Sequence, residues 1–93
     1  MQKYMIIFDE ELTNKLELFE RITDVVKLGY SGIENWDAFR ELMINNLEYR
    51  DIEIEIDHRC KLALPTQDEE MYLDFRSELA AQFGDRITFR LNS

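Results

Sequence analysis

The chain has 93 residues, 45% of them apolar, which is enough for one domain with a modest core and too few for two. Twenty acidic and 11 basic residues give a net charge of −9, which argues against direct binding to nucleic acid and favours a basic partner, unless the acidity only maintains solubility. The single cysteine excludes an internal disulfide, and the composition predicts a cytoplasmic protein without a signal peptide or membrane span.

The first half of the chain predicts one strand and two helices. Residues 3–9 (KYMIIFD) are a short apolar run rich in β-formers, which is typical of a strand. A helix over 14–27 follows, with Thr13 as its N-cap and Gly29 as its end. A second helix is predicted over 34–46. Its apolar residues recur at helical spacing and predict a buried face made of Trp36, Phe39, Met43 and Leu47.

The second half predicts a strand, a helix and a final strand. Residues 51–57 (DIEIEID) alternate strictly, with isoleucines on one face and acids on the other. Thr66 and Glu69 are spaced as a capping box that starts a helix ending before Gly84. The predicted inward side chains of this helix are Met71, Tyr72, Phe75, Leu79 and Phe83. Residues 86–92 (RITFRLN) alternate again, which predicts the last strand.

The element order β-α-α-β-α-β predicts a parallel sheet with helical crossovers. The alternation in the second and third strands indicates that one face of the sheet is exposed to solvent, so all helices should cover the other face. With right-handed crossovers this requires strand order 1-2-3, because order 2-1-3 would bury Glu53 and Glu55 under the last helix. We therefore expect a single two-layer α/β domain over 1–93, with Arg90 pairing with one of those two glutamates on the open face.

Three acids lie on one side of the second predicted helix. On a helical wheel Glu34, Asp37 and Glu41 fall within about 60° of one another, nearly opposite the apolar face. The helix dipole favours the first two acids but does not explain Glu41. The stripe is either an ordinary solvated face or a docking surface for a basic protein. It does not predict a metal site, because three residues along one straight helix span about 10 Å and cannot surround one ion.

Other residues give no indication of catalysis. His58 and Cys60 are close in sequence, but a thiol nucleophile also needs a positioned base and an oxyanion site, and the sequence indicates neither. We interpret them as a connector histidine and a packed cysteine. No phosphate loop, zinc motif or dinucleotide fingerprint is present, so we expect no cofactor and no enzymatic activity.

Gly29 and Gly32 bracket a turn directly before the acidic helix. The segment YSGIENWDAFREL, residues 30–42, resembles the signature of the barstar family, the intracellular inhibitors of secreted bacterial ribonucleases. The length and the element order of the chain are also similar to that family. The resemblance implies a two-layer α/β fold with a three-stranded parallel sheet in order 1-2-3, in agreement with the topology argued from the strands.

The resemblance also implies a mechanism. In the family the turn and the second helix plug the ribonuclease active site, and their carboxylates occupy the places of substrate phosphates. Tyr30 and Gly32 match the turn, Asn35 matches the helix start, and Asp37 and Glu41 match the two acids. A rigid row of carboxylates suits a site that presents Arg, Lys and His in fixed positions.

Several residues depart from the family pattern. Ile33 is an extra residue before the helix, Arg40 replaces the usual tryptophan, and Glu41 is longer than the usual aspartate. The late-helix acid has Glu78 as its nearest match. We therefore predict a chain that is monomeric when free and inhibits a basic ribonuclease or toxin of its own; the alternative is an acidic interaction module whose partner is not a nuclease. The predicted partner-binding residues are Tyr30, Gly32, Glu34, Asn35, Asp37, Arg40, Glu41 and Glu78.

Overall fold

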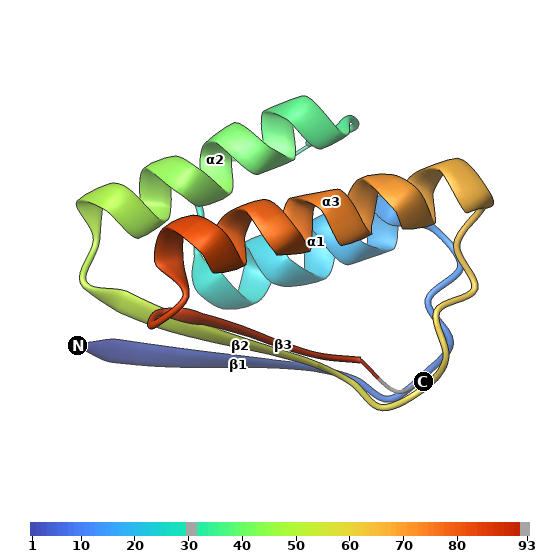
Figure 1. Cartoon of the computed structure of the whole chain (residues 1–93), viewed down its shortest axis with the longest axis horizontal. Helices are drawn as coiled ribbons and strands as arrows, with labels where there is room; N and C mark the ends of the chain where they lie inside the picture. The colour runs from blue at the N-terminus through green and yellow to red at the C-terminus, as the bar shows by residue number, and fades with distance from the viewer. Residues whose placement is uncertain (30–31, 92–93) are drawn as a thin grey trace.

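The computed structural model describes residues 1–29 and 32–91 and has the predicted element order (Figure 1). The strands are β1 (Gln2–Phe8), β2 (Ile52–His58) and β3 (Ile87–Leu91), and the helices are α1 (Lys15–Val26), α2 (Trp36–Tyr49) and α3 (Thr66–Phe83). All three helices lie on one side of the sheet, so the fold has two layers. No helix in the described part of the chain is long and apolar enough to cross a membrane.

The sheet is parallel, with strand order β1-β2-β3, as predicted. Its centre is β2, where Ile54 is paired with Tyr4 on one side and Ile87 on the other. The alternating isoleucines of β2 are buried against the helices, and the acids between them are only half-buried. The one-sided burial predicted from the alternation is therefore confirmed.

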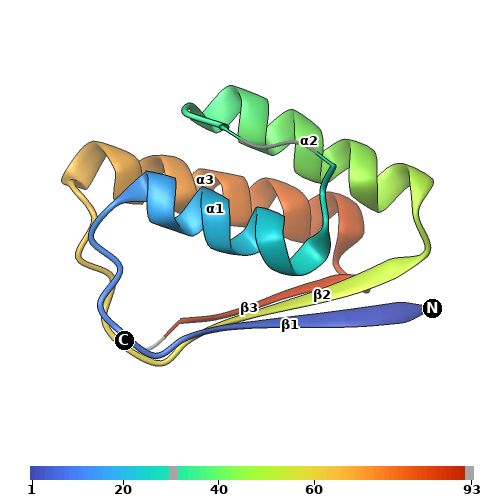
Figure 2. The ribbon, with the colours of Figure 1, turned by 180° about the vertical axis from the view of Figure 1, so that it is seen from behind.

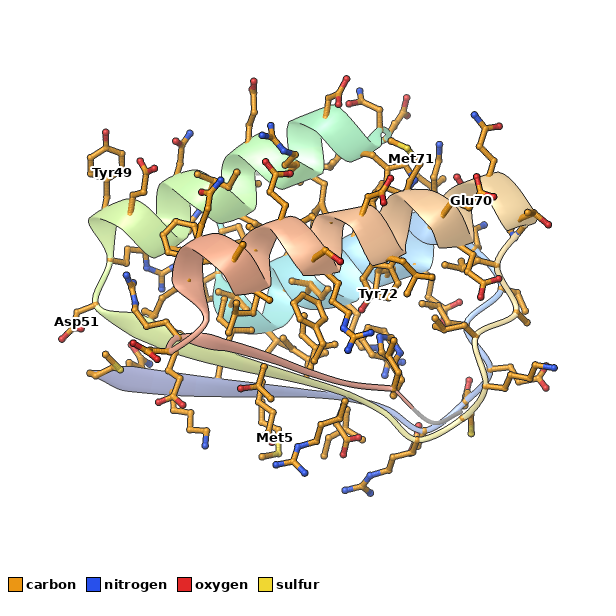
Figure 3. All side chains as sticks on the ribbon, in the orientation of Figure 1. Met5, Tyr49, Asp51, Glu70, Met71 and Tyr72 are labelled. Carbon is orange, nitrogen blue, oxygen red and sulfur yellow. The ribbon has the colours of Figure 1, made fainter. Side chains whose placement is uncertain are left out.

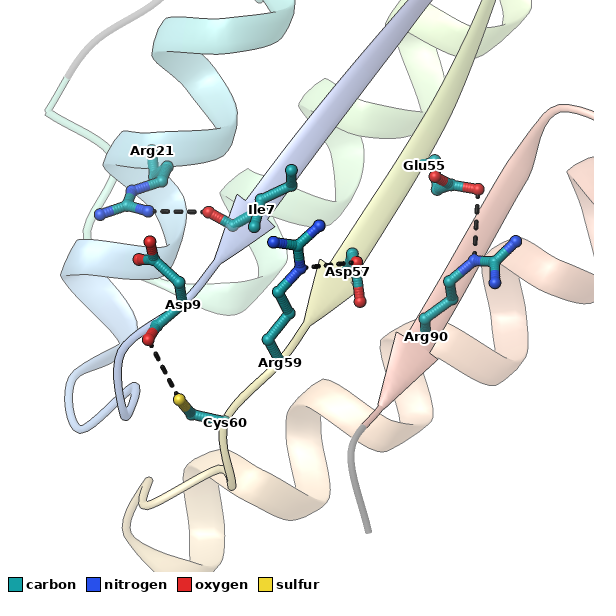
Figure 4. A network of polar contacts seen from close by, with 8 residues as sticks. All are labelled: Ile7, Asp9, Arg21, Glu55, Asp57, Arg59, Cys60 and Arg90. Carbon is teal, nitrogen blue, oxygen red and sulfur yellow. Dashed lines mark hydrogen bonds and ion pairs between the residues drawn. The ribbon is translucent and has the colours of Figure 1, made fainter.

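The open face of the sheet carries ion pairs between neighbouring strands and loops (Figure 4). Arg90 Nε lies 3.3 Å from Glu55 Oε1, which confirms the expected cross-strand pair. Arg59 Nε lies 3.3 Å from Asp57 Oδ2. Exposed ion pairs of this kind contribute about 0.2–1 kcal/mol each to the free energy of unfolding. They therefore add little to the stability of the sheet, and this face stays polar and solvent-exposed.

An aromatic cluster joins the three helices above the sheet. The Phe19 ring of α1 stacks on Phe39 of α2 with a centroid distance of 4.5 Å, and Phe39 lies 5.2 Å from Phe75 of α3. Trp36 packs edge-on against Phe19 at 4.9 Å. Aromatic pairs add about 0.5–1.5 kcal/mol beyond their buried area, so this cluster fixes how α2 sits on the other two helices.

The caps of α1 and α3 differ from the sequence prediction, and α2 spans Trp36–Tyr49 where 34–46 was predicted, because Asn35 caps it and it continues for three more residues. Asn14, not Thr13, caps α1, and its side chain accepts a hydrogen bond of 2.8 Å from the Leu16 backbone N–H. The capping box of α3 is wrong: Pro65 occupies the cap position, and the Glu69 backbone N–H donates to the Pro65 carbonyl at 2.9 Å. Thr66 is already helical, so its hydroxyl is one position too late to act as a cap.

The ends of α1 and α3 and one side chain of α3 also differ from the prediction. α1 ends at Val26, because Lys27 takes a left-handed conformation with φ of 61°, two residues before Gly29. α3 ends at Phe83 as predicted, but Gly84 stays right-handed with φ of −52°. Met71, predicted to face inward, is 38% exposed because α3 turns it towards solvent. The predicted strand bounds are within one residue of the observed ones.

Candidate functional site

The start of α2 is fixed by contacts on both sides of its first residue. Asn35 is the N-cap, and its side chain accepts a hydrogen bond of 2.8 Å from the Ala38 backbone N–H. Trp36 is only 7% exposed, and its Nε1–H donates to Asp68 Oδ1 on α3 at 3.2 Å. The structure thus gives Asn35, predicted as a partner contact, a local role as the cap. The helix that follows begins at a defined place and in a defined rotation.

Asp37 and Glu41 of the predicted acidic stripe lie on the solvent side of α2, whereas Glu34, predicted to be helical, lies before the Asn35 cap in the segment that enters the helix. Glu34, Asp37 and Glu41 are all exposed, while the apolar face of the helix is buried. The buried residues of α2 are the four predicted ones, Trp36, Phe39, Met43 and Leu47. The buried face fixes the rotation of the helix, so the acids cannot turn away from solvent without unpacking the core.

The same face of α2 continues beyond the predicted residues. Glu48 is exposed and lies seven positions after Glu41, two helical turns further along the same side. Tyr49 at the end of the helix is 83% exposed and points away from the body of the molecule (Figure 3). Neither residue was predicted from the sequence, although the seven-residue spacing from Glu41 to Glu48 also places Glu48 on the same side of the helix as Glu41. We use the name acidic stripe for Glu34, Asp37, Glu41 and Glu48.

Arg40 is the one basic residue between Glu34 and Glu48. Its side chain forms an ion pair with Glu78 of α3. Its Nε–H donates to Glu78 Oε2 at 2.6 Å, and its Nη2 donates to Glu78 Oε1. The bidentate pair raises the pKa of the Arg40 guanidinium and lowers the pKa of the Glu78 carboxyl. Glu78, predicted to contact a partner, is therefore engaged within the chain. The positive charge of Arg40 is compensated mainly by Glu78, with smaller contributions from Asp37 and Glu41.

The turn before α2 lies between two positions that favour glycine. Gly29 and Gly32 have φ of 84° and 76°, a region that other residues rarely adopt. Tyr30, the predicted turn contact, lies outside the described residues. Ile33, which the barstar resemblance predicts to be an extra residue, is 8% exposed and joins the hydrophobic core. Ile33 thus anchors the chain just before Glu34.

Arg50 holds the end of α2 against the end of α1. Its Nη1 donates to the carbonyl oxygens of Val26 and Lys27 at 3.0 and 3.1 Å, and its Nη2 donates to the Tyr4 hydroxyl at 3.1 Å. A cation at the last carbonyls of a helix is favoured by the helix dipole. Arg50 therefore fixes the distance between the two helices whose connection forms the turn.

His58 and Cys60 take structural positions. His58 is buried at the end of β2, where Nε2 shares a hydrogen bond of 2.6 Å with the Tyr72 hydroxyl, so it is not the connector residue that we expected. The Cys60 thiol donates to the Asp9 carbonyl at 3.1 Å (Figure 4). Among the described residues, no group of three or more His, Cys, Asp or Glu side chains is placed to hold a metal ion.

No protein-family model, curated protein or solved structure matches this chain. Its resemblance to the barstar family therefore remains a prediction from residues 30–42 and from the element order. The structure adds a helix with three exposed acids on one side, Asp37, Glu41 and Glu48, a fourth exposed acid, Glu34, just before its cap, and a neighbouring arginine that is paired with α3. Such a surface can bind a concave basic site by charge-assisted hydrogen bonds.

Proposed function

We propose that the protein is an inhibitor of a basic ribonuclease-type toxin, and that α2 enters the active site of the toxin with Asp37 and Glu41 at the centre. The observation that carries the proposal is the exposed acidic stripe on a helix whose rotation is fixed by its buried face. A ribonuclease active site holds cations in place for phosphates, and the same cations can pair with carboxylates.

The spacing and the rigidity of the stripe support this role. Asp37 and Glu41 are four residues apart, so their positions differ by about 6 Å along the helix axis. Both side chains project from backbone that is already ordered, which reduces the entropy lost on binding. The pairing of Arg40 with Glu78 leaves these carboxylates free to meet a basic partner.

The test is inhibition of RNA cleavage by a panel of small basic ribonucleases that includes any toxin encoded beside this chain's gene. We expect at least one of them to be inhibited stoichiometrically. Asp37→Asn and Glu41→Gln should each raise the inhibition constant at least about thirtyfold, the effect of losing about 2 kcal/mol at an interface centre. The matched control is Glu17→Gln, an exposed acid on α1 outside the stripe, which should change the constant less than about threefold.

Two outcomes would contradict the proposal. If the panel shows no inhibition, the inhibitor function is wrong. If Glu17→Gln weakens inhibition as much as Glu41→Gln, the stripe acts only through net charge and the site assignment is wrong. Thermal unfolding of each variant separates loss of binding from loss of folding, because these exposed polar substitutions should leave the melting temperature nearly unchanged. Specific binding of the same stripe to a protein without nuclease activity would instead support the interaction module.

A further inference from the structure

A groove lies between α1 and the segment that enters α2. Its volume is about 360 Å³, within the range of sites that hold small ligands or single side chains. Phe19 and Ile33 form its floor, and Leu16, which is 43% exposed, forms an apolar wall. Figure 2 shows α1 in front of α3, with the start of α2 above it on the same side of the molecule. The groove is therefore next to the acidic stripe.

Three carboxylates surround this apolar floor. Glu20 and Asp24 line the groove from α1, and Glu34 lines it from the segment before α2. None of the described residues that line the groove is basic. Arg21 of α1 is directed to the sheet instead, where its Nη1 donates to the Ile7 carbonyl at 3.0 Å and its guanidinium covers the Phe8 ring. An apolar floor beside three carboxylates disfavours acidic occupants and favours an apolar group that carries a positive charge.

The groove thus combines two features, an apolar floor and nearby carboxylates. A long aliphatic chain ending in a cation fits both, because its stem covers the floor while its charged end reaches the carboxylates.

We propose that this groove receives a lysine or arginine side chain of the partner protein. Glu34 belongs both to the groove and to the acidic stripe, so one partner can contact α2 and α1 together. The inference deepens the proposed function and rests on it for the identity of the partner as a basic protein. It extends the predicted interface to Leu16, Glu20, Thr23 and Asp24, which sequence reasoning did not assign to binding.

The groove is tested first with a small probe, n-hexylammonium chloride, added to the ¹⁵N-labelled protein. Backbone amide shifts of Leu16, Thr23 and Ile33 should saturate with the probe. The uncharged analogue 1-hexanol should bind at least tenfold more weakly. The double variant Glu20→Gln/Asp24→Asn should also raise the apparent Kd at least tenfold. The matched double Glu10→Gln/Glu17→Gln removes two exposed charges outside the groove and should leave the Kd within about twofold.

The same two double variants are then compared in the ribonuclease inhibition assay. We expect Glu20→Gln/Asp24→Asn to weaken inhibition at least tenfold and the control double to weaken it less than threefold. Equal binding of hexylammonium and hexanol, or no saturable shifts, would overturn the cationic groove. Inhibition that is unchanged in Glu20→Gln/Asp24→Asn but lost in Glu41→Gln would overturn the groove while leaving the proposed function intact. If no ribonuclease is inhibited, the probe titration still tests the groove by itself.

Discussion

At the scale of single residues, the buried pair of His58 and Tyr72 has the clearest consequence. The His58 ring is 2% exposed, stacks on Phe8 at 4.7 Å and bonds the Tyr72 hydroxyl. Burial lowers the pKa of His58 from 6.5 to about 4, and the nearby Asp57 opposes the shift only in part. Burial also raises the pKa of Tyr72 far above its usual range. Both side chains are therefore neutral at pH 7 in the folded chain.

We predict that His58 makes the folded state sensitive to acid. In the unfolded chain His58 takes up a proton near pH 6.5, whereas in the folded chain it does so only near pH 4. The full stability is therefore present above pH 6.5, and about 2–3 kcal/mol should be lost as the pH falls from 7 to 4.5. Urea denaturation at several pH values measures this loss.

The variant His58→Gln isolates this contribution from that of the carboxylates. Glutamine cannot take up the proton, but its amide can still bond the Tyr72 hydroxyl. Stability of the variant should therefore fall less steeply between pH 7 and 4.5 than that of the native chain. In Tyr72→Phe the histidine stays buried, so the steep fall should persist. Parallel pH profiles of the native chain and His58→Gln would show that His58 does not carry the effect.

At the scale of elements, the contact between α2 and α3 sets the electrostatics of the proposed site. The pair between Arg40 and Glu78 joins two residues that are 38 positions apart in sequence. Asp37 and Glu41 are near enough to raise the pKa of the Arg40 guanidinium further, after the larger effect of Glu78. Arg40 thus lies within reach of the stripe, and its bond to Glu78 decides which carboxylate it neutralises.

We predict that Glu78→Gln weakens binding of the basic partner without contacting it. Once Glu78 is neutral, Arg40 can pair with Asp37, three residues earlier on the same helix, and cover part of the stripe. Inhibition should weaken about three- to tenfold, which corresponds to about 1 kcal/mol. The double variant Arg40→Gln/Glu78→Gln removes both charges and should restore inhibition to within about twofold of the native value. If the double variant is as weak as Glu78→Gln, then Glu78 itself contacts the partner.

At the scale of the whole molecule, all three helices and the core lie on one side of the sheet. The radius of gyration of 12.2 Å is that of a compact domain of this length. Met5 lies on the other side of the sheet, away from the helices, and is 51% exposed (Figure 3). Figure 1 shows α2 on the side of the helical layer away from the sheet, so its exposed acids and the open sheet face are on opposite sides of the protein.

This one-sided arrangement predicts opposite results for neighbouring residues of β2. Ile54 is fully buried under the helices, and Ile54→Ala should lower the free energy of unfolding by about 2–5 kcal/mol. Glu53 is paired with Lys3 in the β1–β2 register on the open face, and Glu53→Ala should cost less than about 1 kcal/mol. Chemical denaturation measures both. Equal losses in the two variants would contradict a sheet with only one buried face.

The sequence alone determined the element order, the strand order and the side of α2 that faces solvent. These features follow from periodicity: isoleucines at every second residue of β2 define one buried face, and apolar residues three or four apart in α2 define another. When only one face of the sheet is covered by helices and the crossovers are right-handed, the strand order must be β1-β2-β3. Because such patterns are local, Asp37 and Glu41 could be placed on the outer face of α2 before any contact was known.

The tertiary structure alone decided which distant side chains meet. The pairing of Arg40 with Glu78, the burial of His58 against Tyr72 and the groove lined by Asp24 and Glu34 each join separate elements. Periodicity tells which face of a helix is buried, but not how that helix is shifted along its neighbour. That shift is set by the fit of large side chains in the core, such as the aromatic cluster between α1, α2 and α3.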